Sequence, residues 1–141
     1  MDVEFCTNVD RVDRDWLWHE LTEHAYWAKY RTRDMFEKQL DAAWRVVGAY
    51  DTGDGRMVGF ARAFSDGAAV AYLADVYVHR HERGRGIGAG ILRVMIDDGP
   101  GRDFRWMLHT NDAHVLYAKF GFTAPDCTFM QRDFRLQHVR T

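Results

Sequence analysis

The chain has 141 residues, of which 47% are hydrophobic and 28% are charged, and its formal net charge is −2. This length and composition suit one globular domain that is large enough to bury a core. The near-neutral charge gives no reason to expect nucleic acid or an anionic membrane surface as a partner.

The cysteines and the N-terminus bear on the cellular compartment. Cys6 and Cys127 lie far apart and form no metal-binding or redox spacing, which suits a reducing compartment. No apolar run approaches the roughly 18 residues that a membrane-spanning helix needs. Residues 1–4 lack the basic and apolar regions of a signal peptide. We therefore expect a cytoplasmic protein.

Hydrophobic periodicity and turn residues predict the elements of the first half of the chain. The expected elements are a strand at 3–7, a helix from Asp13 or Asp15 to about His24, a helix that begins after Thr32 and runs to about Ala43, and strands at 45–50 and 57–64. The glycine-containing turn at 51–55 joins the last two strands into a hairpin.

A long strand that ends near Val78 opens the second half of the chain. After it we expect a helix to about Asp97, a strand at 104–109, a helix at 113–120 and a last strand near 128–132. The Gly-Pro-Gly run at 99–101 stops the first of these helices. Because strands precede and alternate with helices, we expect a mixed sheet covered by helices on both faces.

The most informative stretch of the sequence is the glycine-rich run Arg83–Gly90, which lies between a predicted strand and a predicted helix. Free backbone N–H groups and the positive end of the helix dipole would meet there, and both attract phosphate. Glycines let the backbone approach a ligand closely. Arg83 and Arg85 add planar donors that suit phosphate oxygens. The stretch therefore predicts a phosphorylated cofactor.

Two common phosphate-binding loops fit this stretch poorly. A P-loop requires a lysine followed by serine or threonine after its last glycine, and neither pair occurs here. The dinucleotide fingerprint Gly-x-Gly-x-x-Gly is missed by one position, because Gly86, Gly88 and Gly90 are evenly spaced. That fingerprint also usually opens its domain, whereas this loop lies past mid-chain. A dinucleotide-binding oxidoreductase is therefore a distant possibility.

A third pattern, Arg/Gln-x-x-Gly-x-Gly/Ala, is matched by Arg83, Gly86 and Gly88. Downstream, Ala113–Phe122 is similar to a helix ending of the form Leu-Tyr-x-Lys-x-Gly-Phe, and a short predicted strand lies between the two motifs. With both motifs in this order, the chain resembles the GNAT superfamily of acyl-CoA N-acyltransferases. The resemblance covers about residues 3–133 and implies a single domain over residues 1–141.

This resemblance implies both a fold and an activity. The implied fold is α+β with three α/β/α layers, in which a mixed, largely antiparallel sheet splays between its fourth and fifth strands. The implied activity is transfer of an acetyl group from acetyl-CoA to a primary amine, directly and in a ternary complex. No metal is expected, and a homodimer is possible because dimers are common among related proteins. A non-catalytic acyl-CoA-binding or regulatory module is the alternative, since fold and loop do not guarantee turnover.

The resemblance also implies where coenzyme A binds. A bulge within Asp75–Val78 would free backbone groups for the pantetheine arm and the thioester carbonyl, and the loop would hold the pyrophosphate. The expected cofactor-binding residues are Val76, Tyr77, Val78, Arg83, Gly84, Arg85, Gly86, Ile87, Gly88, Ala89, Thr110, Asn111 and Tyr117. Family members often carry Asn where this chain has Thr110, so an Asn contact at the usual place is in doubt.

Tyr117 is the leading catalytic candidate. Family members often use the tyrosine at this position to protonate the departing thiolate, and its ordinary pKa of about 10 suits a donor that is neutral at pH 7. The general base is open among acidic and histidine side chains, with Asp75 placed first because it lies in the cofactor strand. The other candidates are Glu20, His24, Asp66 and His109.

The acceptor is expected to bind beside the segment between the first two helices, which holds Ala25–Tyr30. Its aromatic rings suit an acceptor with an apolar or cationic part. The expected substrate-binding residues are Glu20, Tyr26, Trp27 and Asp75. A small amine, an amino sugar, an amino acid and a peptide N-terminus all remain open. His79 and His81 lack the further ligands that a metal site would need.

Overall fold

The computed structural model describes residues 2–25, 28 and 30–133. Its centre is a five-stranded sheet with strands in sequence order. The strands are β1 (Val3–Cys6), β2 (Arg45–Asp51), β3 (Met57–Ser65), β4 (Val70–Val78) and β5 (Arg105–Met107). Neighbouring strands are antiparallel except β4 and β5, which are parallel. The expected mixed, largely antiparallel sheet is confirmed.

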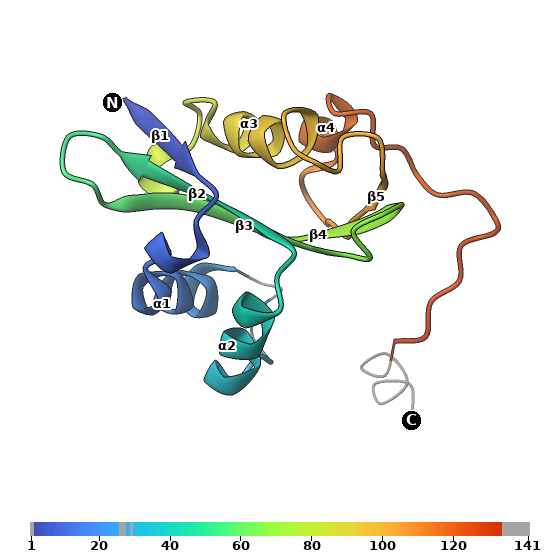
Figure 1. Cartoon of the computed structure of the whole chain (residues 1–141), viewed down its shortest axis with the longest axis horizontal. Coiled ribbons are helices and arrows are strands. Elements are labelled where there is room, and N and C mark those ends of the chain that lie inside the picture. Colours follow the sequence, from blue (N-terminus) through green and yellow to red (C-terminus); the bar gives the residue numbers. More distant parts are fainter. Residues whose placement is uncertain (1, 26–27, 29, 134–141) are drawn as a thin grey trace.

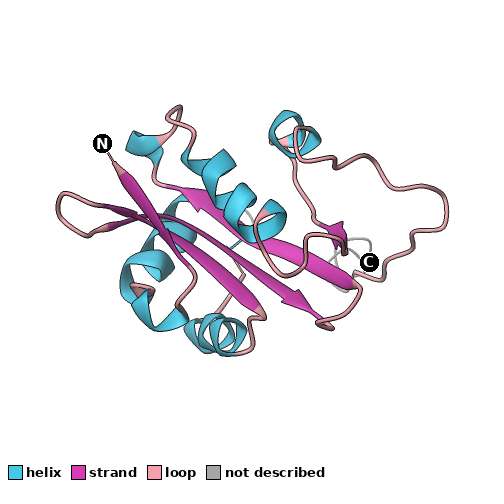
Figure 2. Cartoon of the chain, turned by 45° about the horizontal axis from the view of Figure 1, so that its top comes forward, coloured by secondary structure: helices cyan, strands magenta, loops and turns pink. Residues whose placement is uncertain are grey.

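Helices cover both faces of the sheet (Figures 1 and 2). On one face lie α1 (Arg14–His24) and α2 (Arg33–Asp41), and on the other lie α3 (Ile87–Leu92) and α4 (His114–Ala118). Shorter helical segments are η1 (Val9–Arg11), η3 (Arg80–Glu82) and the π-helical η4 (Arg93–Asp97), which continues α3. The predicted three-layer α/β/α arrangement is confirmed. Within the described residues, no helix has the length and apolar character that crossing a membrane requires.

The helix starts follow the predicted caps. The Asp13 carboxylate accepts a hydrogen bond from the Trp16 amide at 3.1 Å, and the Thr32 hydroxyl accepts one from the Met35 amide at 3.2 Å. Each bond satisfies an amide that the first turn of a helix leaves unpaired. The predicted cap at Thr32 is confirmed, and of the two candidates for the first helix, Asp13 and Asp15, the cap is Asp13.

The strand predicted near 128–132 is wrong. Residues 123–133 contain no helix or strand, and they extend away from the sheet after α4 (Figure 1). Met130 is 90% exposed, so this apolar side chain gains nothing from burial here. A short apolar stretch forms a strand only where it pairs with a sheet edge and buries a face against a core.

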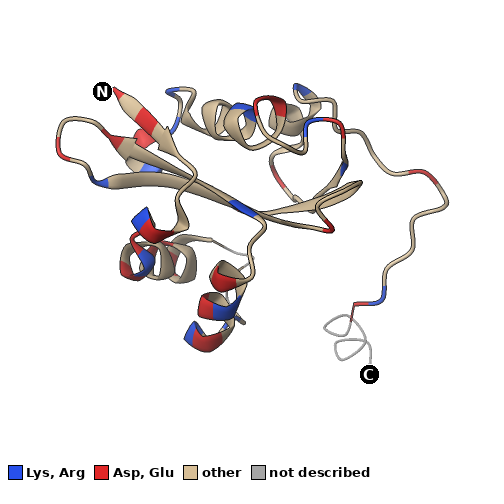
Figure 3. Cartoon of the chain, in the orientation of Figure 1, with Lys and Arg blue, Asp and Glu red and all other residues tan. Residues whose placement is uncertain are grey.

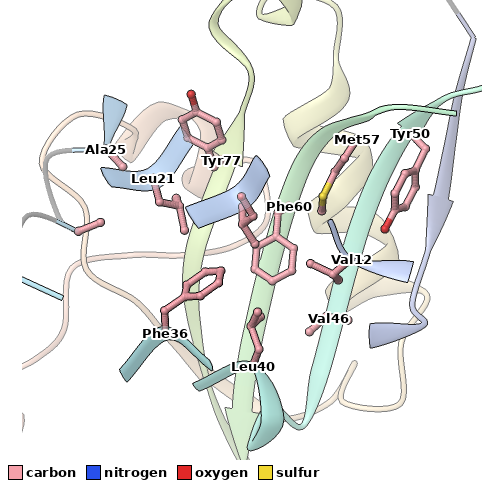
Figure 4. Close-up of a cluster of buried hydrophobic side chains, with 12 residues drawn as sticks. Val12, Leu21, Ala25, Phe36, Leu40, Val46, Tyr50, Met57, Phe60 and Tyr77 are labelled. Carbon is pink, nitrogen blue, oxygen red and sulfur yellow. The ribbon is translucent and has the colours of Figure 1, made fainter. Parts of the chain in front are cut away.

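The face of the sheet under α1 and α2 carries an apolar cluster drawn in Figure 4. Leu21 from α1, Phe36 and Leu40 from α2, and Phe60 from β3 are almost fully buried in it. Tyr77 reaches the same cluster from β4 and lies beside Leu21 (Figure 4). The packing holds α1 against the end of β4, which is where the candidate site lies.

Ion pairs fix α1 and α2 relative to each other. Arg14 pairs with Glu37, and Arg33 donates to Asp15 at 2.8 Å. Figure 3 shows acidic and basic residues interspersed along both helices. These pairs tie the start of α1 to α2.

Candidate functional site

The site begins with an irregularity in β4. Phe60 pairs with Tyr77 and Arg62 with Ala74, so one residue of β3 lies opposite Asp75 and Val76 of β4. Asp75 has a φ of 55°, a left-handed conformation that is uncommon for a residue with a side chain. Two residues against one, with positive φ, make a β-bulge. The bulge predicted within Asp75–Val78 is confirmed.

Beyond the bulge, β4 presents an open edge. The β5 strand pairs with β4 at Val70–Tyr72, and within the described part of the chain that ladder goes no further. The His79 amide donates to the Val58 carbonyl of β3 at 2.8 Å. Because bonding residues alternate along an antiparallel pair, the backbone groups of Val76 and Val78 face away from β3. They point to the side that β5 leaves open.

The glycine-rich loop lies at the end of this open edge. Arg83 Nε donates to the Val78 carbonyl at 3.1 Å, which ties the loop to β4. Gly84 and Gly86 have φ of 82° and 79°, and a Cβ built on either would meet nothing within 4 Å. Gly86 is also the N-cap of α3. The loop therefore exposes backbone that a ligand can approach closely.

Charged side chains surround the base of the loop. Glu82 is buried and accepts a bond from Arg56 at 2.9 Å, and this contact together with the positive charge of Arg85 lowers the pKa of the Glu82 carboxyl despite its burial. Arg85 lies 3.5 Å from Glu82 and is about half exposed. A shallow hollow of about 250 Å³ beside the loop is lined by Asp2, Arg85, Gly86 and Arg93 among others. Two arginines therefore border it against one carboxylate.

The second sequence motif, at 113–122, lies beside the glycine-rich loop in the folded protein. A Cβ built on Gly88 would lie 3.8 Å from Leu116 of α4 and 3.8 Å from Val78 of β4. Tyr117, the next residue of α4, is buried and packs edge-on against Phe122 with ring centroids 5.8 Å apart. The two motifs, separated in the sequence, thus converge on the open end of β4.

Thr110 holds the turn that leads into α4. Its hydroxyl oxygen accepts a hydrogen bond from the Ala113 amide at 3.1 Å. The hydroxyl proton can still be donated to a ligand. This local structural role is independent of whether Thr110 and Asn111 touch a cofactor.

Asp75 is a buried carboxylate with strong partners. It accepts from Arg31 through both terminal guanidinium nitrogens at 2.7 Å and from Arg62 Nε at 2.7 Å. Burial alone would raise its pKa, but the Arg31 hydrogen bonds and the Arg62 charge outweigh burial and lower the pKa of Asp75 below its ordinary value. This arrangement argues against Asp75 as a proton acceptor.

Glu20 is a second buried carboxylate, and its partners are weaker. Its oxygens lie 3.4 Å from the Tyr77 hydroxyl, 3.4 Å from His79 Nε2 and 3.7 Å from His24 Nε2. In the described part of the chain, no arginine or lysine pairs with it. Burial, together with the negative charge of Glu20, raises the pKa of Tyr77. Within the described residues, the ion-pair partners of Glu20 are His24 and His79, each of which is cationic only when protonated.

The histidine beside Glu20 has a defined tautomer. His79 Nδ1 accepts a hydrogen bond from the His81 amide at 3.2 Å. In the neutral ring the proton then resides on Nε2, which faces Glu20. Trp16 stacks on His79 with centroids 6.3 Å apart and meets the Tyr77 ring edge-on. An aromatic wall thus encloses the Glu20 carboxylate.

The other candidate bases have structural partners. Asp66 accepts from the amides of the turn at 68–70, and these bonds lower its pKa. His109 bonds to Tyr72 and, at 2.9 Å, to Gln131. Tyr26 and Trp27 lie outside the described residues.

Sequence reasoning missed Arg31 and Arg62 as members of the site. Arg62 carried a readable signal, because it is a charged residue inside the otherwise apolar strand β3. A guanidinium placed there requires a buried carboxylate partner. Arg31 carried no such signal, since it lies between two helices where exposed charge is ordinary.

Known proteins resemble this chain in both sequence and structure. The model of the acetyltransferase (GNAT) family matches residues 13–122. A structure from Xanthomonas campestris pv. campestris, described as belonging to the GNAT family, is 34% identical, with 94% of each chain covered and a TM-score of 0.85. An acetyltransferase structure from Deinococcus radiodurans R1 is 25% identical over 93% of this chain and 89% of that one, with a TM-score of 0.72.

A more distant structure bears on the fold alone. It is an acetyltransferase from Clostridium acetobutylicum solved with acetyl-CoA, 15% identical over 97% of this chain and 99% of that one, with a TM-score of 0.70. A search of curated proteins gave no match. With the family model spanning most of the sequence and the Xanthomonas structure matching nearly all of it, this chain belongs to the GNAT family of acetyltransferases.

Proposed function

We propose that the protein is an N-acetyltransferase that moves an acetyl group from acetyl-CoA to a primary amine, directly and in a ternary complex. The observation that carries this proposal is the open edge of β4, which runs from the bulge at Asp75 and Val76 to the glycine-rich loop. A relative of the same fold, from Clostridium acetobutylicum, was solved with acetyl-CoA. Family membership supports the same chemistry here.

The residues at the loop fit coenzyme A. Gly84 and Gly86 leave a space that any Cβ would begin to fill, and the amides at the start of α3 suit a pyrophosphate. We propose that Arg83, Gly84, Arg85, Gly86, Ile87, Gly88 and Ala89 hold the pyrophosphate, that Val76, Tyr77 and Val78 hold the pantetheine arm, and that Thr110, Asn111 and Tyr117 complete the site.

The proposed reaction joins the amine nitrogen to the acetyl carbon and breaks the carbon–sulfur bond. The outward-facing amide of Val76 is suited to donate a hydrogen bond to the acetyl oxygen as negative charge develops there. Tyr117 is suited to give its hydroxyl proton to the sulfur as the bond breaks. The amine must lose a proton before or during attack, and we place the receiving group on the Glu20 side of β4.

On the acceptor side, we propose that Glu20 attracts the amine as its ammonium ion. The carboxylate makes long contacts with a hydroxyl and two histidine rings and lies beside an aromatic wall, an arrangement that suits a cation. Tyr26 and Trp27 are proposed to contribute to the same side. Asp75, already held by Arg31 and Arg62, is assigned a positioning role in place of that of a base.

Titration calorimetry with acetyl-CoA, followed by a thiol-release assay against a panel of amines, tests the proposal. We expect acetyl-CoA binding and amine-dependent thiol release that falls sharply in Tyr117→Phe. Binding of acetyl-CoA without release by any amine would favour the non-catalytic acyl-CoA-binding module. Absence of acetyl-CoA binding would overturn the proposed function altogether.

A further inference from the structure

We infer that Arg31, Asp75 and Arg62, here named the arginine clamp, form a positioning device that fixes the chain entering α2 to the bulge of β4. The clamp joins elements that the sequence separates widely, since Arg31 and Asp75 are 44 residues apart. The inference that the clamp fixes the bulge depends on the geometry alone. The inference that the clamp affects catalysis rests on the proposed function, because the thioester is proposed to lie at the bulge.

The clamp is built as a buried cluster. The side chains of Arg31, Asp75 and Arg62 are 9%, 3% and 10% exposed. Arg31 binds both carboxylate oxygens of Asp75, and its Nη1 also donates to the Gln39 side chain at 2.9 Å. A bidentate arginine–carboxylate pair fixes orientation as well as distance. The cluster therefore sets where the chain before α2 lies relative to β4.

The bulge itself needs such support. Among the described residues, Asp75 is the non-glycine residue that has a positive φ. That conformation costs free energy, so it persists only where the surroundings enforce it. The clamp bonds the Asp75 side chain on the face under α1 and α2, whereas Leu73 packs on the opposite face, with α3. The side chains of a regular strand alternate strictly, so residues 73 and 75 would share a face without the bulge. Holding Asp75 under α2 thus holds the bulge open.

The bulge in turn determines which backbone groups face the open edge. The register changes by one residue across Asp75 and Val76. If β4 were regular through this point, the outward and inward amides would exchange places on one side of it. The clamp therefore controls whether the Val76 amide is presented at the proposed reaction centre. It also places the acceptor side of the site at a fixed distance from that amide.

A regular buried salt bridge that only stabilises the fold is the competing explanation. The two explanations predict different effects of a conservative substitution on kcat, on the KM for the amine and on the acetyl-CoA Kd. Asp75→Asn keeps the shape and tolerates the left-handed backbone, but removes the charge that holds both arginines. Arg31→Lys keeps the charge but loses the bidentate geometry. The matched control is Arg33→Gln, which removes an α2 arginine that pairs with Asp15 and Glu37 and, within the described residues, forms no ion pair with β4.

The kinetic test measures thiol release and acetyl-CoA binding for all these variants. We expect Asp75→Asn and Arg31→Lys to lower kcat about 10- to 100-fold and to raise KM for the amine, because misplacing reacting groups by about 1 Å costs on that order. The acetyl-CoA Kd should rise less than the KM for the amine, because the pyrophosphate loop is untouched and only the pantetheine contacts beside the bulge are disturbed. Wild-type kinetics in both variants, or an equal loss of affinity for both substrates, would overturn the inference.

A second measurement keeps the inference testable if a variant folds poorly or if no amine is accepted. Hydrogen–deuterium exchange on the ligand-free protein compares the peptides that contain Arg31 and Asp75. We expect Gln39→Leu, which removes one hydrogen bond from Arg31 and no charge, to raise exchange in both peptides together, and Arg33→Gln to leave the Asp75 peptide unchanged. A rise confined to the Arg31 peptide would overturn the clamp. Failure of wild-type protein to bind acetyl-CoA would instead overturn the proposed function and leave this exchange result standing.

Discussion

Arg31 donates to both carboxylate oxygens of Asp75 at 2.7 Å, across 44 residues of sequence and with both side chains buried. This pair separates the roles of the two acidic groups under β4. Asp75 is saturated by guanidinium groups, whereas Glu20 has contacts of 3.4 Å or longer to two histidine rings and a hydroxyl. A carboxylate already neutralised by arginine is a poor proton acceptor. This is why we place the proposed binding and deprotonation of the amine on the Glu20 side.

The first prediction concerns stability. Asp75→Ala leaves two guanidinium groups buried without a counter-charge, and we expect the free energy of unfolding to fall by about 3–5 kcal/mol. Urea denaturation followed by tryptophan fluorescence measures it. The control is Asp41→Ala, which removes the exposed ion pair with Arg14 and should cost less than about 1 kcal/mol. Equal losses in the two variants would contradict the assignment of Asp75.

The second prediction concerns pH. The pKa of Asp75 is lowered in the folded protein, so folded Asp75 binds fewer protons than unfolded Asp75. Its contribution to stability is then complete above the unfolded pKa of about 3.9 and is lost as pH falls through the folded pKa. We expect the difference in unfolding free energy between wild type and Asp75→Asn to be constant from neutral pH to about pH 5 and to shrink below about pH 4. A difference that changes between pH 6 and 8 would point to another group.

Local signals in the sequence predicted most of the fold. Apolar runs on either side of the turn at 51–55 marked β2 and β3, and side-chain caps at Asp13 and Thr32 fixed where α1 and α2 begin. These features depend on a few neighbouring residues, so a single sequence contains them. The strand expected near 128–132 failed for the same reason, since its pattern is local but its pairing would have required a distant partner edge.

In the site too, features set by contiguous residues were predicted and features set by the tertiary fold were not. The glycine-rich loop and the position of the bulge were predicted, because the motif and the resemblance both act on contiguous residues. The partners of Asp75 were not predicted, because Arg31 reaches it only through the tertiary fold. Because Arg31 and Arg62 bind Asp75, we now assign it a positioning role in place of that of a base. A titratable residue can be found from sequence, but the charges around it decide what it does.

The third prediction compares two glycines of α3. A Cβ on Gly88 would make ordinary contacts at 3.8 Å, whereas a Cβ on Gly90 would overlap the Phe5 ring of β1. We expect Gly88→Ala to leave stability unchanged or slightly higher while weakening acetyl-CoA binding. Gly90→Ala should lower stability by about 1–3 kcal/mol through overpacking. Calorimetry with acetyl-CoA and thermal unfolding separate the two effects. Full acetyl-CoA affinity in Gly88→Ala would argue against the proposed loop contact.

The fourth prediction concerns Tyr117. Removing its hydroxyl takes away the proposed proton donor and leaves the packing of the ring against Phe122 in place. We expect Tyr117→Phe to lower kcat about 100-fold or more, the usual range for loss of a general acid. The acetyl-CoA Kd and the melting temperature should stay close to wild type. A variant with unchanged kcat would remove Tyr117 from the reaction.

The last prediction addresses the acceptor. Glu20→Gln keeps the size of the side chain and its contacts with Tyr77 and His79, but removes the charge proposed to attract an ammonium ion. We expect KM for the amine to rise about tenfold, equivalent to about 1.4 kcal/mol of lost interaction, with acetyl-CoA affinity unchanged. Glu23→Gln, on the same helix, serves as the matched control. The rise should shrink at high salt, because the attraction is electrostatic. If Glu20→Gln instead lowers kcat with KM unchanged and shifts the acidic limb of the pH–rate profile, Glu20 receives the proton of the amine and does not merely bind it.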